Sequence, residues 1–161
     1  MGICGCGKTT AAKFIQQYLH CPYAEGDDFH TQANRDKMGT GIPLNDVDRF
    51  PWLENLRGWM SGQAAAGVPY TVVTCSALKK IYRDILRGAQ GEVYFIHLAP
   101  PVSVNRARME ARQGHYMKAD MVDSQLAILE PLAPEEKGVV IDNAGEPESV
   151  QNDIRIWLET L

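Results

Sequence analysis

The first residues that could carry chemistry form a glycine-rich segment, GICGCGKTT, at positions 2–10. Gly2, Gly7, Lys8 and Thr9 fit the pattern G-x-x-x-x-G-K-[ST], in which glycines let backbone N–H groups converge on phosphate oxygens. Lys8 would reach the β- and γ-phosphates of a nucleotide, and the Thr9 hydroxyl would bind Mg²⁺. The segment predicts a nucleotide-binding loop, the alternative being a merely flexible glycine-rich terminus. The residues expected to contact the nucleotide are Gly2, Ile3, Cys4, Gly5, Cys6, Gly7, Lys8, Thr9 and Thr10.

A cluster of acids in the segment EGDDFH, residues 25–30, follows a short apolar run that is predicted to be a strand. Ligands of open α/β sheets bind at the carboxyl ends of the strands, which is where these acids would lie. Phosphoryl transfer from ATP to a hydroxyl needs a carboxylate that orients and deprotonates the hydroxyl. Glu25, Asp27 and Asp28 are the clustered carboxylates in that position. The alternative is a solvated loop in which Asp28 caps the next helix.

The cysteines argue against a disulfide framework and against a zinc centre. The four of them are spaced irregularly, which favours reduced thiols in a cytoplasmic protein. Cys4 and Cys6, together with His20 and Cys21, invite a zinc interpretation, but C-x-C inside a phosphate loop is not a zinc-finger spacing. We interpret Cys4 and Cys6 as small loop residues with some reactivity near a helix N-terminus.

Length and charge narrow the class of protein further. A chain of 161 residues is expected to form one domain, residues 1–161, with a real core. The net charge of −4 argues against nucleic-acid or membrane-surface partners. Residues 58–78 carry no charge, but polar residues, glycine and proline interrupt the run, so it does not predict a membrane-spanning helix. The start of the chain does not resemble a signal peptide.

Apolar runs of strand length alternate with amphipathic segments along the whole chain. This alternation predicts an α/β fold, in which helices cover both faces of a parallel sheet. The predicted strands are residues 23–27, 70–75, 93–98 and 138–142. The predicted helices are residues 8–20, 48–60, 77–88, 101–112, 119–130 and 146–161.

One strand is missing from this pattern. A phosphate loop normally follows a strand, usually a central one, but only Met1 precedes the loop here. Without that strand, its neighbours would expose unpaired edges. We therefore expect either that the chain is truncated at its N-terminus or that another segment fills the position.

Five segments together resemble the small P-loop gluconokinases, which are relatives of shikimate and adenylate kinases. They are MGICGCGKTT, EGDDFH, NRDKMGTGIPLNDVDRFPWL, CSALKKIYRDILR and RMEARQGHYM, and the resemblance runs from residue 2 to about residue 131. It implies a three-layer α/β/α P-loop NTPase fold with a five-stranded parallel sheet of the nucleoside- and shikimate-kinase type. It also implies ATP-dependent phosphorylation of D-gluconate to 6-phospho-D-gluconate, with Mg²⁺. Such relatives are often homodimers, and the oligomeric state stays open here.

The resemblance implies roles for the acidic segment. Asp27 would be the catalytic base that contacts the acceptor hydroxyl, and Glu25 an outer-sphere partner of Mg²⁺. Asp28 and His30 would hydrogen-bond the polyol. The strand at 70–75 ends without an aspartate, so Glu25 and Asp27 would also cover the second metal-supporting acid found in many relatives.

Gluconate carries a carboxylate, which calls for cationic recognition, preferably by arginine. Arg49 and Arg83 are the best candidates, and Lys79 is the next, followed by Lys80 and Arg35. For Arg83, the alternative is a helical surface arginine paired with a neighbouring acid. Arg49 would equally serve to fix the start of the helix that follows it.

The segment RARMEARQGHYMKAD, residues 106–120, looks like the mobile lid of these kinases, with the lid itself at about 112–120. Arg108 and Arg112 are four residues apart and share a helix face, and Gly114 would act as a hinge. Arg108 would contact the nucleotide, and Arg112, nearer the loop, is the favoured catalytic arginine over the γ-phosphate. His115 would touch the substrate or stabilise the closed lid.

Three points are left open by the sequence. Asn143 and Pro147 are weak candidates for contacts with the adenine ring. Another small hydroxy acid such as shikimate is an alternative acceptor, although CSALKK, where shikimate kinases carry glycines, argues against shikimate. A non-catalytic nucleotide-binding or thiol-sensing module is the alternative from a different class.

Overall fold

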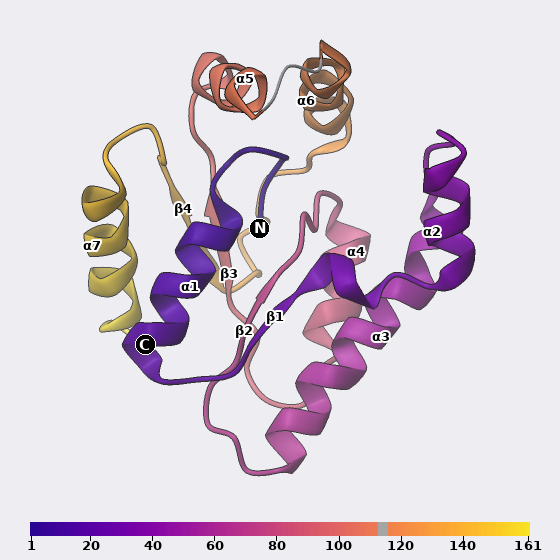
Figure 1. Cartoon of the computed structure of the whole chain (residues 1–161). Helices are drawn as coiled ribbons and strands as arrows, with labels where there is room; N and C mark the ends of the chain where they lie inside the picture. Colours follow the sequence, from indigo (N-terminus) through magenta and orange to yellow (C-terminus); the bar gives the residue numbers. More distant parts are fainter. Residues whose placement is uncertain (113–115) are drawn as a thin grey trace.

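The computed structural model describes residues 1–112 and 116–161, with residues 116–120 described through their backbone alone. In chain order the elements are α1 (Lys8–Leu19), β1 (Tyr23–Glu25), the 3₁₀ helix η1 (Gly26–Phe29), α2 (Gln32–Gly39), α3 (Asp46–Ala65), β2 (Val72–Thr74), α4 (Lys80–Arg87), β3 (Phe95–Leu98), α5 (Val102–Ala111), α6 (Tyr116–Ile128), β4 (Gly138–Ile141) and α7 (Pro147–Leu158) (Figure 1).

The four strands lie in the four ranges that the sequence predicts, and their pairing is parallel. β1 pairs with β2, with Tyr23 opposite Val72. β3 pairs with β4, with Phe95 opposite Gly138. In the described part of the chain these are two separate two-stranded ladders, β1–β2 and β3–β4. The predicted parallel α/β architecture is confirmed, with the sheet divided between β2 and β3.

Met1 and Gly2 bridge the two ladders. The Met1 ammonium donates to the Ile96 carbonyl at 2.6 Å, and the Leu98 N–H donates to the Met1 carbonyl at 3.0 Å. On the other side, the Gly2 N–H donates to the Ser76 carbonyl at 3.2 Å. A cavity of about 590 Å³ is lined by residues of both ladders, among them Val72, Val73, Phe95 and Ile96. The strand expected before the loop stays a prediction. The hydrogen bonds of residues 1–2 to both ladders hold the first residues of the loop in place.

Helices cover the strands on both sides, which completes the three-layer arrangement (Figure 1). α1 and α7 pack together on one side, where Ile15 and Ile154 belong to one buried cluster. α3 and α4 pack together on the other side, where Leu53 and Leu86 belong to a second cluster. α5 and α6 lie together at the end of the strands where the N-terminal loop runs (Figure 1). None of the helices in the described residues has the length and apolar character needed to cross a bilayer.

The start of α3 is fixed by a reciprocal cap that the sequence prediction missed. The Asn45 side chain accepts from the Asp48 N–H at 2.8 Å, and the Asp48 carboxylate accepts from the Asn45 N–H at 2.9 Å. This capping box satisfies two orphan donors and starts the helix at Asp46, two residues before the predicted start. Pro51 therefore lies inside the helix rather than in its first turn.

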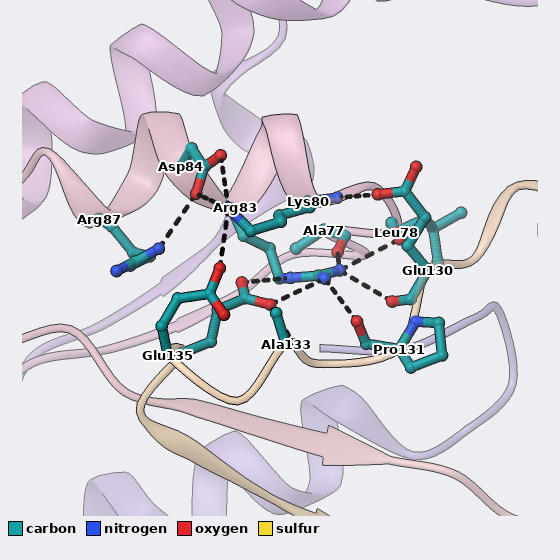
Figure 2. A network of polar contacts seen from close by, with 11 residues as sticks. Ala77, Leu78, Lys80, Arg83, Asp84, Arg87, Glu130, Pro131, Ala133 and Glu135 are labelled. Atoms are coloured by element: carbon teal, nitrogen blue, oxygen red, sulfur yellow. Dashed lines mark hydrogen bonds and ion pairs between the residues drawn. The ribbon is translucent and has the colours of Figure 1, made fainter.

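Arg83 is the largest fully buried side chain of the described residues, and it ties α4 to the segment before β4. Its Nε and Nη2 donate to the two carboxylate oxygens of Glu136 at 2.7 and 3.0 Å. Burial alone would raise the pKa of Glu136, but hydrogen bonds from Arg83 and from the Ala133 N–H outweigh it and lower that pKa. Figure 2 shows the remaining guanidinium contacts, which go to the carbonyls of Ala77, Leu78, Glu130 and Pro131.

This geometry does not fit the prediction that Arg83 binds substrate. The side chain is 0% exposed and every guanidinium nitrogen already has a protein acceptor. A buried charge is tolerated only when it is paired and hydrogen-bonded, which is the situation here. We therefore remove Arg83 from the candidate substrate contacts and assign it to the fold.

Replacing Arg83 with methionine should strongly destabilise the protein. The change leaves the Glu136 carboxylate buried without its partner, and loss of one member of such a pair costs about 3–5 kcal/mol. Arg87→Met is the matched control, because Arg87 lies on the same helix but pairs with Asp84 at the surface and should contribute under about 1 kcal/mol. Urea unfolding of both variants measures the difference, and equal losses would contradict the structural role of Arg83.

His97 should make the stability depend on pH. Its side chain is buried on β3, and burial first, then the Met1 ammonium and Arg83, lower its pKa from 6.5 to about 4. The unfolded chain therefore binds more protons between these values, so stability present above pH 6.5 is lost as the pH falls toward 4. The total loss should be about 3 kcal/mol.

Free energies of unfolding measured between pH 4.5 and 6.5 test this expectation. His97→Gln should flatten the slope, whereas His20→Asn, which changes an exposed histidine, should leave it unchanged. An unaltered slope in His97→Gln would mean that another group carries the dependence.

Candidate active site

The N-terminal loop wraps around its own lysine. Lys8 Nζ donates to the carbonyls of Gly2 and Ile3, each at 2.9 Å. Gly7 ends the loop in the left-handed region, with φ of 97°, and α1 begins at the next residue. A Cβ on Gly7 would lie 2.3 Å from Asn143 Nδ2, so the backbone approaches that side chain as only glycine allows. The predicted loop is thus followed directly by the helix that its motif requires.

Side chains from three distant segments hold the loop from outside. Asn143, just after β4, donates to the Cys6 carbonyl at 2.5 Å. Asn105 of α5 donates to the Cys4 carbonyl at 2.8 Å, and Gln125 of α6 accepts from the Cys4 N–H at 2.6 Å. Sequence reasoning missed Asn105 and Gln125, since neither belongs to a motif that could have pointed to it. Asn143 was a candidate for the adenine, and here its amide holds the loop.

A cavity of about 330 Å³ lies beside the loop, a volume within the range of small-ligand sites. Gly5, Gly7 and Thr10 of the predicted nucleotide set line it, as do Arg108 and Arg112. The Arg108 side chain also donates to the Asn143 carbonyl at 2.7 Å. Pro147, the other adenine candidate, lines the same cavity. Both arginines of the predicted lid segment and the loop therefore line the same cavity.

Thr9 and Glu25, the two predicted metal-site residues, are in direct contact. The Thr9 hydroxyl donates to Glu25 Oε2 at 3.2 Å, and the Thr74 hydroxyl donates to Glu25 Oε1 at 2.5 Å. The Tyr23 hydroxyl also donates to this carboxylate. Burial would raise the pKa of Glu25, but the bonds from Thr74, Tyr23 and Thr9 outweigh it and lower that pKa. Tyr23 and Thr74, which sequence reasoning missed, keep Glu25 ionised and aimed at Thr9.

The oxygen ligands that Thr9 and Glu25 offer limit which metal ion could bind between them. Among the described residues there is no group of three or more His, Cys, Asp or Glu side chains that could hold an ion. Mg²⁺ is usually bound by one or two protein oxygens together with substrate phosphates and water. A hydroxyl and a carboxylate in contact, Thr9 and Glu25, fit that need beside a phosphate loop.

Asp27 lies in η1, at the carboxyl end of β1, and its placement depends on Gly26. A Cβ on Gly26 would lie 2.0 Å from the Thr74 carbonyl, so this turn packs flush against β2. The Gly26 carbonyl accepts from Trp52 Nε1 at 2.7 Å. Asp27 and Lys8 both act electrostatically on the Cys75 thiol, whose pKa rises to about 11, chiefly through burial. The predicted base thus lies two residues after Glu25, which contacts Thr9 beside the predicted phosphate lysine.

His30 lies next to Asp27 and is fixed on an aromatic ring. It stacks on Trp52, with ring centroids 4.2 Å apart and planes 19° apart. Burial lowers the pKa of His30, Asp27 opposes this shift, and Arg35 and Arg49 add to it. His30 is thus neutral at neutral pH.

Some of the other residues predicted to bind substrate lie near His30, and one of them lies away from it. Arg35 donates to the Asp28 backbone carbonyl at 2.9 Å, and the Asp28 side chain is exposed. Arg49 and Lys79 meet at the buried ring of Tyr82. Lys80 instead pairs with acids at the surface of α4, away from this cluster.

Part of the predicted lid lies outside the described residues. Gly114 and His115 fall there, as do the side chains of residues 116–120. Arg112 ends α5, and its charge opposes the rise that burial causes in the pKa of the Cys4 thiol, so it lies close to the loop. The roles of Arg112 and His115 stay predictions.

Comparison with known proteins identifies the family. No protein-family model matches the chain. The probable gluconokinase of Schizosaccharomyces pombe is 46% identical over 145 residues, which cover 87% of this chain and 75% of that protein. The gluconokinase of Gluconobacter oxydans is 39% identical over 154 residues, which cover 96% of this chain and 86% of that protein. The chain belongs to the gluconokinase family.

A solved gluconokinase supports the same assignment in three dimensions. The structure from Sinorhizobium meliloti 1021 superposes with a TM-score of 0.82 at 32% identity, covering 100% of this chain and 95% of that one. The resemblance predicted from the sequence and the P-loop kinase fold are both confirmed. The site described above is therefore the candidate active site of a gluconokinase-family chain.

Replacing Gly7 with alanine should weaken nucleotide binding. The added Cβ would clash with Asn143 at the left-handed φ, and strain of this kind costs about 1–3 kcal/mol. We expect the Kd for an ATP analogue, measured by calorimetry, to rise at least about tenfold. Gly41→Ala is the control, because Gly41 also has a positive φ, of 79°, but a Cβ there meets nothing within 4 Å. Similar affinities in both variants would show that the close contact at Gly7 is unimportant.

Proposed function

We propose that this protein transfers the γ-phosphoryl group of ATP to the 6-hydroxyl of D-gluconate, giving ADP and 6-phospho-D-gluconate. The observation that carries the proposal is the contact between Thr9, at the start of α1, and Glu25, beside the turn that holds Asp27, in a chain of the gluconokinase family. A cytoplasmic location belongs to the same proposal, since all four cysteines are free thiols.

The loop and α1 would hold the triphosphate. Backbone N–H groups of a glycine-rich loop and the positive end of the following helix attract phosphate oxygens. Lys8 would leave the Gly2 and Ile3 carbonyls to pair with the β- and γ-phosphates. The nucleoside would extend into the cavity of about 330 Å³ lined by Arg108 and Pro147.

Thr9 and Glu25 would hold Mg²⁺, the Thr9 hydroxyl directly and the Glu25 carboxylate through water. When bound, the ion neutralises charge on the β- and γ-phosphates. Tyr23 and Thr74 would keep the Glu25 carboxylate turned toward Thr9 throughout.

Asp27 would orient the acceptor and take its proton. The 6-oxygen of gluconate forms a bond to the γ-phosphorus, the bond from that phosphorus to the β–γ bridging oxygen breaks, and the hydroxyl proton passes to the Asp27 carboxylate. Arg112 would stabilise the charge on the transferring group. Asp28 and neutral His30 would hydrogen-bond the remaining hydroxyls, and Arg49 and Lys79 would face the carboxylate.

An ATP-coupled assay across sugar acids tests the substrate. Gluconate should be turned over far faster than shikimate, because shikimate presents its carboxylate and hydroxyls on a ring rather than along an extended chain. Equal kcat/KM values for the two acids would contradict gluconate as the substrate. Absence of turnover with any acid, despite ATP binding, would favour a nucleotide-binding module instead.

Asp27→Asn should lower kcat for gluconate by about 10²–10⁴-fold, because the amide cannot accept the proton. Its ATP affinity should change little, since Asp27 is not part of the loop. Asp36→Asn, which changes an exposed acid on α2, should leave kcat unaltered. Retention of the parent kcat in Asp27→Asn would mean that a different group is the base.

A further inference from the structure

A compact cluster joins the first turn of α3 to the start of α4 beside the acceptor site. Lys79 Nζ contacts both carboxylate oxygens of Asp46, at 3.0 and 3.1 Å. The Tyr82 hydroxyl donates to Asp46, and Arg49 Nη1 donates to the Tyr82 oxygen at 2.8 Å. The Arg49 guanidinium and the Lys79 ammonium lie 5.4 and 5.8 Å from the centroid of the Tyr82 ring. One ring and one carboxylate therefore set the places of both cations.

The middle of the cluster is rigid and its ends are open. Tyr82 is 2% exposed, so its ring cannot move without disturbing the core between α3 and α4. The side chains of Lys79 and Asp46 are 27% and 43% exposed, so solvent and a ligand can reach them. Arg49 uses one N–H on Tyr82, and its other N–H groups have no protein acceptor within residues 1–112 and 116–161. A guanidinium held at one corner in this way can still receive a carboxylate.

The charge of the cluster suits an anion. Hydrogen bonds from Tyr82 and Lys79 lower the pKa of Asp46, and the bond to Asp46 raises the pKa of Lys79. Burial and the bond to Asp46 raise the pKa of Tyr82, which keeps its hydroxyl neutral. Two cations and one carboxylate leave a net charge of about +1. Arg49 lies three residues before Trp52 on α3, and the Trp52 ring stacks on His30, which places this positive charge next to the acceptor site.

We propose that Asp46 and Tyr82 are positioning residues, which hold Lys79 and Arg49 as a two-cation receptor for the carboxylate of the acceptor. They would thereby set the preference for a sugar acid over a neutral sugar. This inference rests on the proposed gluconate kinase activity and deepens it. Asp46 carries a negative charge inside a receptor for an anion, so it competes with the ligand for the same cations. Its presence therefore needs a geometric reason, and holding Lys79 and Arg49 in place is such a reason.

Asp46→Asn gives opposite results under the two explanations. If Asp46 only competes with the ligand, its removal adds one unit of positive charge and should lower the KM for gluconate. If Asp46 positions the cations, the KM for gluconate should rise by about tenfold or more, in line with the loss of a hydrogen bond to a charged group. The kcat and the KM for ATP should stay within about twofold. A lowered or unchanged KM for gluconate would overturn the inference.

Asp84→Asn is the matched control for charge. Asp84 pairs with Lys80 and Arg87 on the exposed side of α4, and its removal adds the same unit of charge to the protein. Its KM for gluconate should equal that of the parent. If Asp84→Asn raised this KM as much as Asp46→Asn, a general effect of charge would replace the positioning role.

Tyr82→Phe keeps the buried ring and removes only the hydroxyl, so it tests the role of Tyr82 without a cavity. Its kcat/KM for gluconate should fall at least about tenfold, while that for glucitol, the neutral polyol, should stay the same. Equal losses on both substrates would indicate a merely structural role. Calorimetric Kd values for gluconate, measured with an ATP analogue present, separate this inference from the proposed kinase activity. If the parent protein binds gluconate but does not phosphorylate it, the carboxylate receptor is supported and the kinase function is contradicted.

Discussion

The candidate site depends on how two peptide groups of the N-terminal loop are turned. Asn105 and Asn143 donate to the carbonyls of Cys4 and Cys6 from outside the loop. In a trans peptide the N–H points away from the C=O of the same unit, and the chain has no cis peptides among the described residues. Anchoring these two carbonyls outward therefore turns the N–H groups of Gly5 and Gly7 inward. A loop of small residues has few side chains to hold its own shape, so distant amides supply that rigidity.

A second constraint links the pairing of β1 and β2 to the acidic end of β1. The register places Glu25 opposite Thr74, whose hydroxyl then reaches the Glu25 carboxylate. The next residue, Gly26, packs against the Thr74 carbonyl so closely that no side chain fits. The turn after β1 is thereby fixed, and Asp27 follows it at a set place relative to Thr9 and Lys8. Strand register and one glycine together determine where the proposed base stands.

The sequence predicted the parts that depend on local pattern and missed those that depend on distant partners. The four strands, the loop and the acidic turn each carry a signal within a few residues, and all were found. Arg83 was misjudged because its carboxylate partner, Glu136, lies 53 residues away along the chain. On the same helix the apolar side chain of Ile81 is 48% exposed, because the face that packs is set by α3 and by Glu136. Asn105 and Gln125 were missed for the same reason, since a single polar residue on a helix has no pattern.

The charges around the proposed acceptor site are separated in a way that favours the chemistry. A base next to a cation would be held ionised but would accept a proton less readily. Arg49 and Lys79 are instead engaged with Tyr82 and Asp46, and His30 is neutral because burial lowers its pKa. A neutral imidazole can hydrogen-bond a hydroxyl without forming an ion pair with Asp27. The cluster thus offers positive charge to the carboxylate end of an extended sugar acid, and Asp27 is left to contact the acceptor hydroxyl.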